Sequence, residues 1–189
     1  MTPTLDERLV QSVNDLGTAP WSGTTYRYTT ARRDPLSGEG ARRFGGRWNP
    51  PDLFPTVYLA DPVATCMGEV ERAAADAHIT VEGMLSVPRL LHTITVHDLP
   101  VLDLRSPEAC DAVGLETEDL TGDWDGCQTV GHAAWFLEVA GVLAPSAVGT
   151  GLTLALFEHR TLPGQARLHS SRALTAAVYQ ELRHDATGG

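Results

Sequence analysis

The sequence contains no lysine, and all 14 of its basic residues are arginine. This absence excludes a Schiff-base lysine, a lysine general base and the lysine of a P-loop. The arginines are outnumbered by 24 acidic residues, which gives a formal charge of −10. Because such an acidic chain gains little affinity by displacing the counterions of a polyanion, we expect no direct nucleic-acid partner.

Cysteines, long apolar runs and complete catalytic motifs are also scarce. The three cysteines, Cys66, Cys110 and Cys127, are widely spaced and indicate neither a disulfide framework nor a zinc site. No apolar run reaches the roughly 18 residues of a membrane span, and the acidic N-terminus is unlike a secretory signal. There is no complete Walker A, GxSxG, HExxH or GxGxxG motif. We therefore expect a cytoplasmic protein without membrane contact, metal or bound cofactor.

The length of 189 residues corresponds to one domain. Hydrophobic periodicity and turn residues predict strands at 24–30, 56–60, 91–96, 101–104, 142–144 and 152–157, and helices at 4–16, 61–77, 127–139 and 175–183. A capping box of Thr4 and Glu7 begins the first helix. Because strands and helices do not alternate regularly, the pattern indicates the α+β class rather than a doubly wound sheet.

Arginine and glycine are concentrated in the predicted loop 32–51 and the strand before it. Six of the 14 arginines lie between Arg27 and Arg47, together with Gly38, Gly40, Gly45 and Gly46. Glycine lets backbone amides approach a phosphate closely, and the arginine fork matches phosphate oxygens. The pattern is typical of a site for a small anion and equally of a solvated basic loop with turn glycines, so composition alone does not favour the site.

Aromatic residues gather around the same segment, although only 6% of the chain is aromatic. Tyr26, Tyr28, Phe44, Trp48 and Tyr58 fall within it or beside it. Aromatic faces next to arginines suit a nucleotide with a flat ring, whereas some of these side chains could instead pack in the core. Regular alternation along the strand would place Tyr26 and Tyr28 on one face of the sheet and Arg27 on the other.

A single glutamate stands out on the helix predicted after residue 61. Glu69 follows the small or apolar residues 64–68, and burying an unpaired carboxylate is costly. Pairing with an arginine or exposure to a cavity would account for it, and an exposed position on the helix is the alternative. The segment Asp98–Asp125 contains nine acidic residues opposed only by Arg105, which indicates a solvated face or a surface for a partner.

Taken together, these segments make the sequence similar to the RES domain family, named for its Arg, Glu and Ser. The segments that carry the resemblance are YRYT, GGRWNPP, VYLA, the helix with Glu69, and PSA at Pro145–Ala147. The resemblance runs from about residue 20 to 183 and is strongest to mycobacterial-type toxins. It implies a single RES-type domain over residues 1–189, with a split, mostly antiparallel sheet around an NAD cleft, similar to ADP-ribosyltransferase toxins.

The function implied by the resemblance is that of a toxin enzyme that degrades NAD⁺ by phosphorolysis. NAD⁺ and inorganic phosphate would be substrates, and nicotinamide and ADP-ribose-1″-phosphate the products. The implied partner is a small antitoxin with an Xre-like DNA-binding region, which blocks the cleft and forms an oligomer with the toxin. The residues alone leave open a mono-ADP-ribosyltransferase, an NAD⁺ hydrolase, and a non-catalytic module that binds a nucleotide or a partner.

The resemblance also implies roles for seven residues. We expect Glu69, Arg47 and Arg27 to be catalytic, and Tyr28, Tyr58, Trp48 and Ser146 to bind substrate. Glu69 would face the ribose as positive charge develops, and the arginines would bind the diphosphate or the acceptor phosphate. Ser146 is expected to correspond to the serine of the family, and the alternative is that this serine corresponds to a position in the segment Trp124–Gly126.

Overall fold

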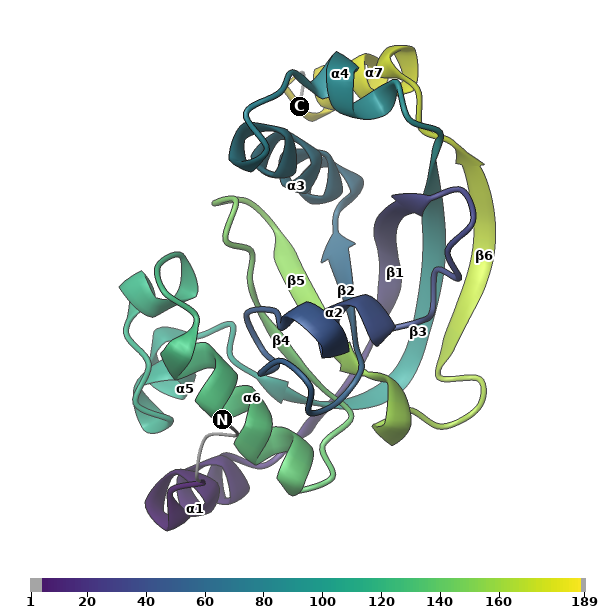
Figure 1. Ribbon diagram of the computed structural model, residues 1–189. Coiled ribbons are helices and arrows are strands. Elements are labelled where there is room, and N and C mark those ends of the chain that lie inside the picture. The colour runs from purple at the N-terminus through teal and green to yellow at the C-terminus, as the bar shows by residue number, and fades with distance from the viewer. Residues whose placement is uncertain (1–4, 188–189) are drawn as a thin grey trace.

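The computed structural model describes residues 5–187, and six strands in it form one sheet (Figure 1). The strand order is β1 (Ala19–Thr30), β2 (Thr56–Asp61), β5 (Leu152–Phe157), β4 (Gly141–Pro145), β3 (Arg89–Asp103) and β6 (Ala166–Ala173). Strand β1 also pairs with β3, so five strands close into a barrel and β6 is attached outside it. All neighbours are antiparallel except β3 and β4, which are parallel.

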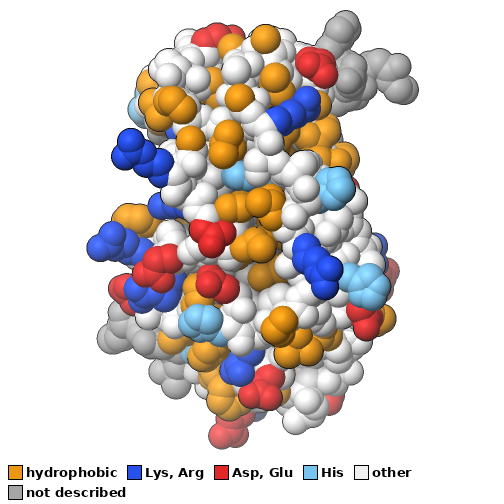
Figure 2. All heavy atoms as spheres, turned by 90° about the vertical axis from the view of Figure 1, so that its right-hand side faces the viewer, with side chains coloured by type: hydrophobic (Ala, Val, Ile, Leu, Met, Phe, Trp, Pro, Cys, Tyr) orange, Lys and Arg blue, Asp and Glu red, His pale blue; other side chains and the backbone are white. Residues whose placement is uncertain are grey.

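The expected α+β class and mostly antiparallel sheet are confirmed, but the sheet is continuous and closed rather than split. Two strand predictions were also wrong. The strands expected at 91–96 and 101–104 are parts of the single strand β3, in which Asp98 adopts a φ of 47° and its amide is bound by Ser22 Oγ. Strand β6 was missed because all but one of its eight side chains are exposed, so it has no buried alternating face. The side of the molecule that carries β6 shows mixed charged, histidine and hydrophobic side chains (Figure 2).

The helices form two groups at opposite ends of the barrel (Figure 1). One group contains α3 (Val63–Asp76), α4 (Val81–Leu85) and α7 (Ala176–Thr187), and the other contains α1 (Glu7–Leu16), α5 (Pro107–Ala112) and α6 (Asp125–Phe136). The short helix α2 (Glu39–Phe44) lies in front of the sheet, and 3₁₀ turns occur at Thr117–Leu120 and Glu158–Arg160. None of the helices within residues 5–187 is long and apolar enough to cross a membrane.

The first helix begins differently from the prediction. Asp6 is its N-cap, and its carboxylate accepts a hydrogen bond from the amide of Arg8 at 2.8 Å. Thr4 of the predicted capping box lies outside the described residues. Helix α3 begins at Val63, since Asp61 is the last residue of β2.

The core has three parts because strand side chains alternate between the inside and the outside of the barrel. The inside is filled by buried aliphatic residues: Val57, Leu59, Ile94, Val96, Leu99, Val101, Ala140, Leu143, Leu154 and Leu156. Outward side chains of β4 and β5 pack against α1, α5 and α6, together with the buried Trp48 and Phe54. A third cluster joins α3, α4 and α7 to Ala60 and Leu91.

The barrel wall is weakest between β1 and β2. These strands pair only at Tyr26 and Ala60, whereas β1 pairs with β3 along nearly its whole length. Beyond Tyr26 the two strands therefore separate, and side chains from both faces of β1 can reach the space between them. This separation lies directly beneath α3 and beside the loop that contains α2.

The packing of α6 on this loop yields a prediction. A Cβ at Gly131 would overlap the carbonyl oxygen of Trp48, so the helix can approach the loop only where the side chain is absent. We expect Gly131→Ala to lower the free energy of unfolding by about 3 kcal/mol, because the clash is with backbone and cannot be relieved by a side-chain rotation. Chemical denaturation followed by circular dichroism measures the change.

Gly126→Ala on the same helix is the matched control. Its Cβ would lie 3.2 Å from a methyl group of Leu115, which is the far end of a side chain. We expect this variant to stay within about 1 kcal/mol of the parent, since alanine is the better helix former. Equal stabilities of the two variants would contradict the close packing of α6 on Trp48.

Candidate active site

A pocket of about 410 Å³ opens where β1 and β2 separate, a volume within the usual range for small-molecule sites. We call it the α3 pocket. Its lining comes from β1, β2, the loop 41–48, α3 and the segment after β4: Tyr26, Arg27, Tyr28, Ala41, Gly45, Gly46, Arg47, Trp48, Tyr58, Leu59, Ala60, Cys66, Glu69, Arg72, Ala73, Asp76, Trp124, Pro145, Ala147 and Thr153. Six of the seven residues expected to form the site are among them, and the seventh, Ser146, contacts Glu69.

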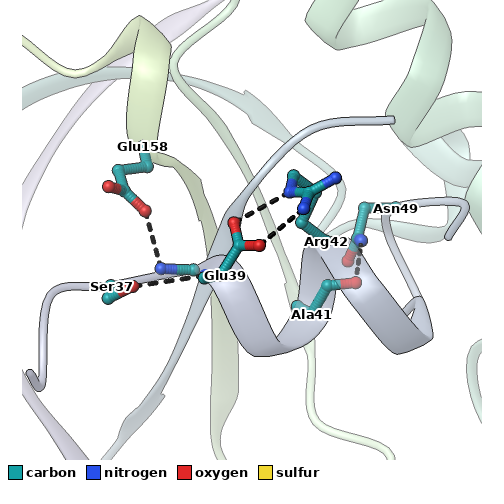
Figure 3. Close-up of polar contacts among 7 residues, drawn as sticks. Ser37, Glu39, Ala41, Arg42, Asn49 and Glu158 are labelled. Carbon is teal, nitrogen blue, oxygen red and sulfur yellow. Dashed lines mark hydrogen bonds and ion pairs between the residues drawn. The ribbon is translucent and has the colours of Figure 1, made fainter. Parts of the chain in front are cut away.

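The loop that carries the arginine-rich segment is held by polar contacts around α2 (Figure 3). Glu158 accepts a hydrogen bond from the amide of Gly38 at 2.6 Å, at the start of the helix. Asn49 donates from Nδ2 to the carbonyl of Ala41 at 2.8 Å and so joins the end of the loop to the helix. The loop is therefore a fixed wall of the pocket.

Gly45 and Gly46 have amides that are already paired within the loop, so they do not form the phosphate cradle expected from the sequence. The amide of Gly45 donates to the carbonyl of Ala41, and the amide of Gly46 donates to the carbonyl of Asn49. Gly46 is required for another reason, because a Cβ there would lie 2.5 Å from the hydroxyl of Tyr58. The glycine allows the loop to lie directly on β2.

Arg27 contacts the loop as well as the pocket. Its Nη1 donates to the carbonyls of Pro35 at 2.7 Å and Ser37 at 3.2 Å. Burial, with a smaller contribution from the charge of Arg33, lowers the pKa of Arg27 to about 10. The guanidinium therefore remains charged at neutral pH. It reaches the pocket beside Tyr26 and Tyr28 because the barrel wall is open there.

Arg47 connects the loop to the segment before α6. Its Nη1 donates to the carbonyls of Asp119 at 2.9 Å and Gly122 at 3.2 Å. Its Nη2 is buried and has no hydrogen-bond partner among the described residues. A buried donor left without a partner is costly.

Tyr58 and Trp48 hold the segment that contains Arg47. The hydroxyl of Tyr58 accepts a hydrogen bond from the amide of Trp48 and donates to Oδ1 of Asn49, both at 2.8 Å. Burial raises the pKa of Tyr58, so the hydroxyl stays protonated. The side chain of Trp48 is only 1% exposed and belongs to the core beneath α6. We therefore expect Trp48 to anchor the loop rather than to stack on a substrate.

Tyr28 is placed differently from Tyr58. Burial raises the pKa of its hydroxyl to about 12, and the guanidinium carbon of Arg89 lies 5.8 Å from the centre of its ring. No hydrogen bond occupies its hydroxyl among the described residues. Tyr28 thus offers the pocket an aromatic face and an available polar group.

Glu69 is the half-buried carboxylate of the pocket. Burial raises its pKa, opposed by the charge of Arg72, by a hydrogen bond from Ser146 Oγ at 3.4 Å and by the charge of Arg47. Ser146 is 4% exposed and does not line the pocket, although its neighbours Pro145 and Ala147 do. Ser146 therefore orients Glu69 from behind.

Sequence reasoning missed several lining residues. Arg72, Ala73 and Asp76 lie three, four and seven positions after Glu69, so they occupy the same face of α3. Helical spacing from Glu69 could have identified them. Trp124, which is 41% exposed at the rim, was considered only as part of the alternative segment Trp124–Gly126. Phe44 was grouped with the aromatic cluster, but it is 76% exposed and does not line the pocket.

Comparison with known proteins places the chain in a known family. Residues 20–178 match the RES domain. Curated proteins from Mycobacterium bovis and Mycobacterium tuberculosis, each named NAD(+) phosphorylase MbcT, are 61% identical over 184 residues, which is 97% of this chain and 99% of each relative. The crystal structure of the M. tuberculosis MbcT–MbcA toxin–antitoxin complex contains a chain that matches with a TM-score of 0.91 and 61% identity, covering 96% of this chain and 100% of that one. The chain belongs to the RES domain family.

Proposed function

We propose that this chain is an NAD⁺ phosphorylase, which splits NAD⁺ into nicotinamide and ADP-ribose-1″-phosphate and acts as the toxin of a toxin–antitoxin pair. The observation that carries the proposal is 61% identity, over 97% of the chain, to proteins named NAD(+) phosphorylase. The geometry of the α3 pocket agrees with it, because a half-buried carboxylate and positively charged arginines line one cavity.

Glu69 is suited to the bond that breaks. When nicotinamide leaves as a neutral molecule, positive charge develops on the ribose carbon and no general acid is required. A carboxylate in a partly desolvated site stabilises this charge more strongly than one in water. Ser146 holds the carboxylate in place through its hydroxyl.

The opposite wall is suited to the diphosphate of NAD⁺. Arg27 and Arg47 are both fixed by bonds to backbone carbonyls, so binding an anion costs them little side-chain entropy. Tyr28 and Tyr58 border the same space and would orient the nicotinamide and the ribose.

Other features of the expected function remain predictions. Water or a protein side chain could accept the ADP-ribosyl group in the same pocket, and the likeness to ADP-ribosyltransferase toxins belongs to these alternatives. We expect an antitoxin partner, because a relative was crystallised in a toxin–antitoxin complex with MbcA. An Xre-like region in that partner, an oligomer with it, and a cytoplasmic location are parts of the same proposal.

The acceptor can be tested directly with NAD⁺ in the presence and absence of inorganic phosphate. We expect the purified chain to release nicotinamide only with phosphate, and mass spectrometry should detect ADP-ribose carrying one extra phosphate. Plain ADP-ribose at all phosphate concentrations would instead identify a hydrolase. No NAD⁺ loss from antitoxin-free protein would overturn the enzymatic proposal and favour a binding module.

The role of Glu69 predicts the effect of removing its charge. Glu69→Gln should lower kcat by about 10²–10³, the range found when a group that stabilises the transition state is lost. Glu71→Gln is the matched control, because Glu71 lies on the same helix but pairs with Arg183 at 2.7 Å. We expect its turnover to be near normal. Equal turnover of the two variants would exclude Glu69 from the reaction.

The burial of Glu69 also predicts the pH dependence. The reaction needs the ionised carboxylate, and burial raises its pKa. Activity should therefore be present above that pKa and fall as pH decreases through it, at a higher pH than for an ordinary glutamate. The hydrogen bond from Ser146 lowers the pKa, so Ser146→Ala should move this acid limb to still higher pH. An unchanged limb in kcat–pH profiles of this variant would argue against the contact.

A further inference from the structure

The pocket face of α3 carries a second charged residue whose function is not explained by the proposed chemistry of Glu69. Arg72 lies one helical turn after Glu69, and both line the α3 pocket. Its charge is the largest influence that keeps Glu69 ionised against burial. The two side chains are therefore close enough to interact across the reacting end of the pocket.

Arg72 differs from the other arginines of the pocket in its available donors. Arg27 and Arg47 both donate to backbone carbonyls of neighbouring loops. Among residues 5–183, whose side chains the structure describes, Arg72 makes no side-chain hydrogen bond or ion pair, and the neighbouring Glu71 pairs with Arg183. The five N–H donors of Arg72 thus remain available for a ligand.

The position of Arg72 also gives it access from a second direction. A second cavity of about 490 Å³ lies against a neighbouring face of α3, and Arg72 borders both cavities. The lining of the second cavity is Gly68, Glu71, Arg72, Ala75, Val148, Thr150 and Arg183. A small anion could reach Arg72 from this side while a nucleotide occupies the main pocket.

We propose that Arg72 binds the acceptor phosphate and places it beside Glu69, an inference that rests on the proposed function. The reaction requires a cation at this point, because a phosphate dianion that approaches the ribose carbon is repelled by the carboxylates of Glu69 and Asp76. The guanidinium of Arg72 offsets this repulsion and binds two phosphate oxygens in its fork.

The assignment separates the two anionic groups of the reaction. The diphosphate of NAD⁺ lies against Arg27 and Arg47, on the wall made by β1 and the loop, and the acceptor phosphate lies against α3. One oxygen of the acceptor forms a bond to the ribose carbon as the carbon–nitrogen bond breaks. The electron pair of that bond leaves on the nicotinamide nitrogen, so the step balances without an added acid.

The test is steady-state kinetics of Arg72→Gln with NAD⁺ and inorganic phosphate varied separately. We expect the KM for phosphate to rise about 10- to 100-fold, as for the loss of charge-assisted hydrogen bonds. The KM for NAD⁺ should change less than about threefold, since only the acceptor site is altered. The share of NAD⁺ converted to plain ADP-ribose should increase, because water then competes with a weakly held phosphate.

Two variants serve as controls. Arg172→Gln removes the same charge from the exposed edge strand β6, outside the pocket, and should leave both KM values unchanged. Arg72→Lys keeps the charge but loses the planar fork, so its KM for phosphate should lie between those of the parent and Arg72→Gln. This second variant also provides the readout if Arg72→Gln does not fold.

The other outcomes each overturn the assignment. A rise in the KM for NAD⁺ with an unchanged KM for phosphate would place the diphosphate at Arg72 instead. Unchanged KM values for both NAD⁺ and phosphate would show that Arg72 binds neither substrate. If the parent chain formed only ADP-ribose, both the proposed function and the role of Arg72 would be wrong. If the parent formed ADP-ribose-1″-phosphate and Arg72→Gln had an unchanged KM for phosphate, only the role of Arg72 would be wrong.

Discussion

The architecture of the site depends on the pair of hydrogen bonds made by the hydroxyl of Tyr58. This buried group accepts from the amide of Trp48 and donates to Asn49, and so fixes a loop segment to the outside of β2. Arg47 lies in that segment and is further tied to the carbonyl of Asp119. Trp48, the next residue, is buried under α6. The same short segment therefore packs against a core helix and positions Arg47 in the pocket.

The pocket exists because the barrel is closed incompletely on one side. The single pairing of Tyr26 with Ala60 allows β1 to leave β2, and the outward tyrosines and the inward-directed Arg27 meet at the gap. The closed part of the barrel, filled with aliphatic side chains, keeps the strands rigid around this opening. A rigid frame matters for a reaction in which two anions must be held close to one carboxylate.

The charged residues of the pocket lie on two walls. The wall made by β1 and the loop carries arginines whose guanidinium groups are fixed by backbone carbonyls, as Arg27 is by those of Pro35 and Ser37. The wall made by α3 carries Glu69, which is backed by the buried Ser146, and Arg72, whose donors have no partner among residues 5–183. Burial of Glu69 raises its pKa and is unfavourable to its charge, and this cost is compatible with a site that stabilises a developing cation.

Local patterns in the sequence were sufficient to predict the α+β class, the arginine-rich loop and Glu69 as an unusual carboxylate on a helix. These features depend on residues that are close together in the chain. The tertiary structure decided what these residues do. The amides of Gly45 and Gly46 are already paired with carbonyls of Ala41 and Asn49. Trp48 lies in the core because it packs under α6, which is distant in the chain. Closure of the sheet and the existence of β6 could not be predicted, because they depend on the pairing of β1 and β6 with β3, and no local pattern encodes this pairing.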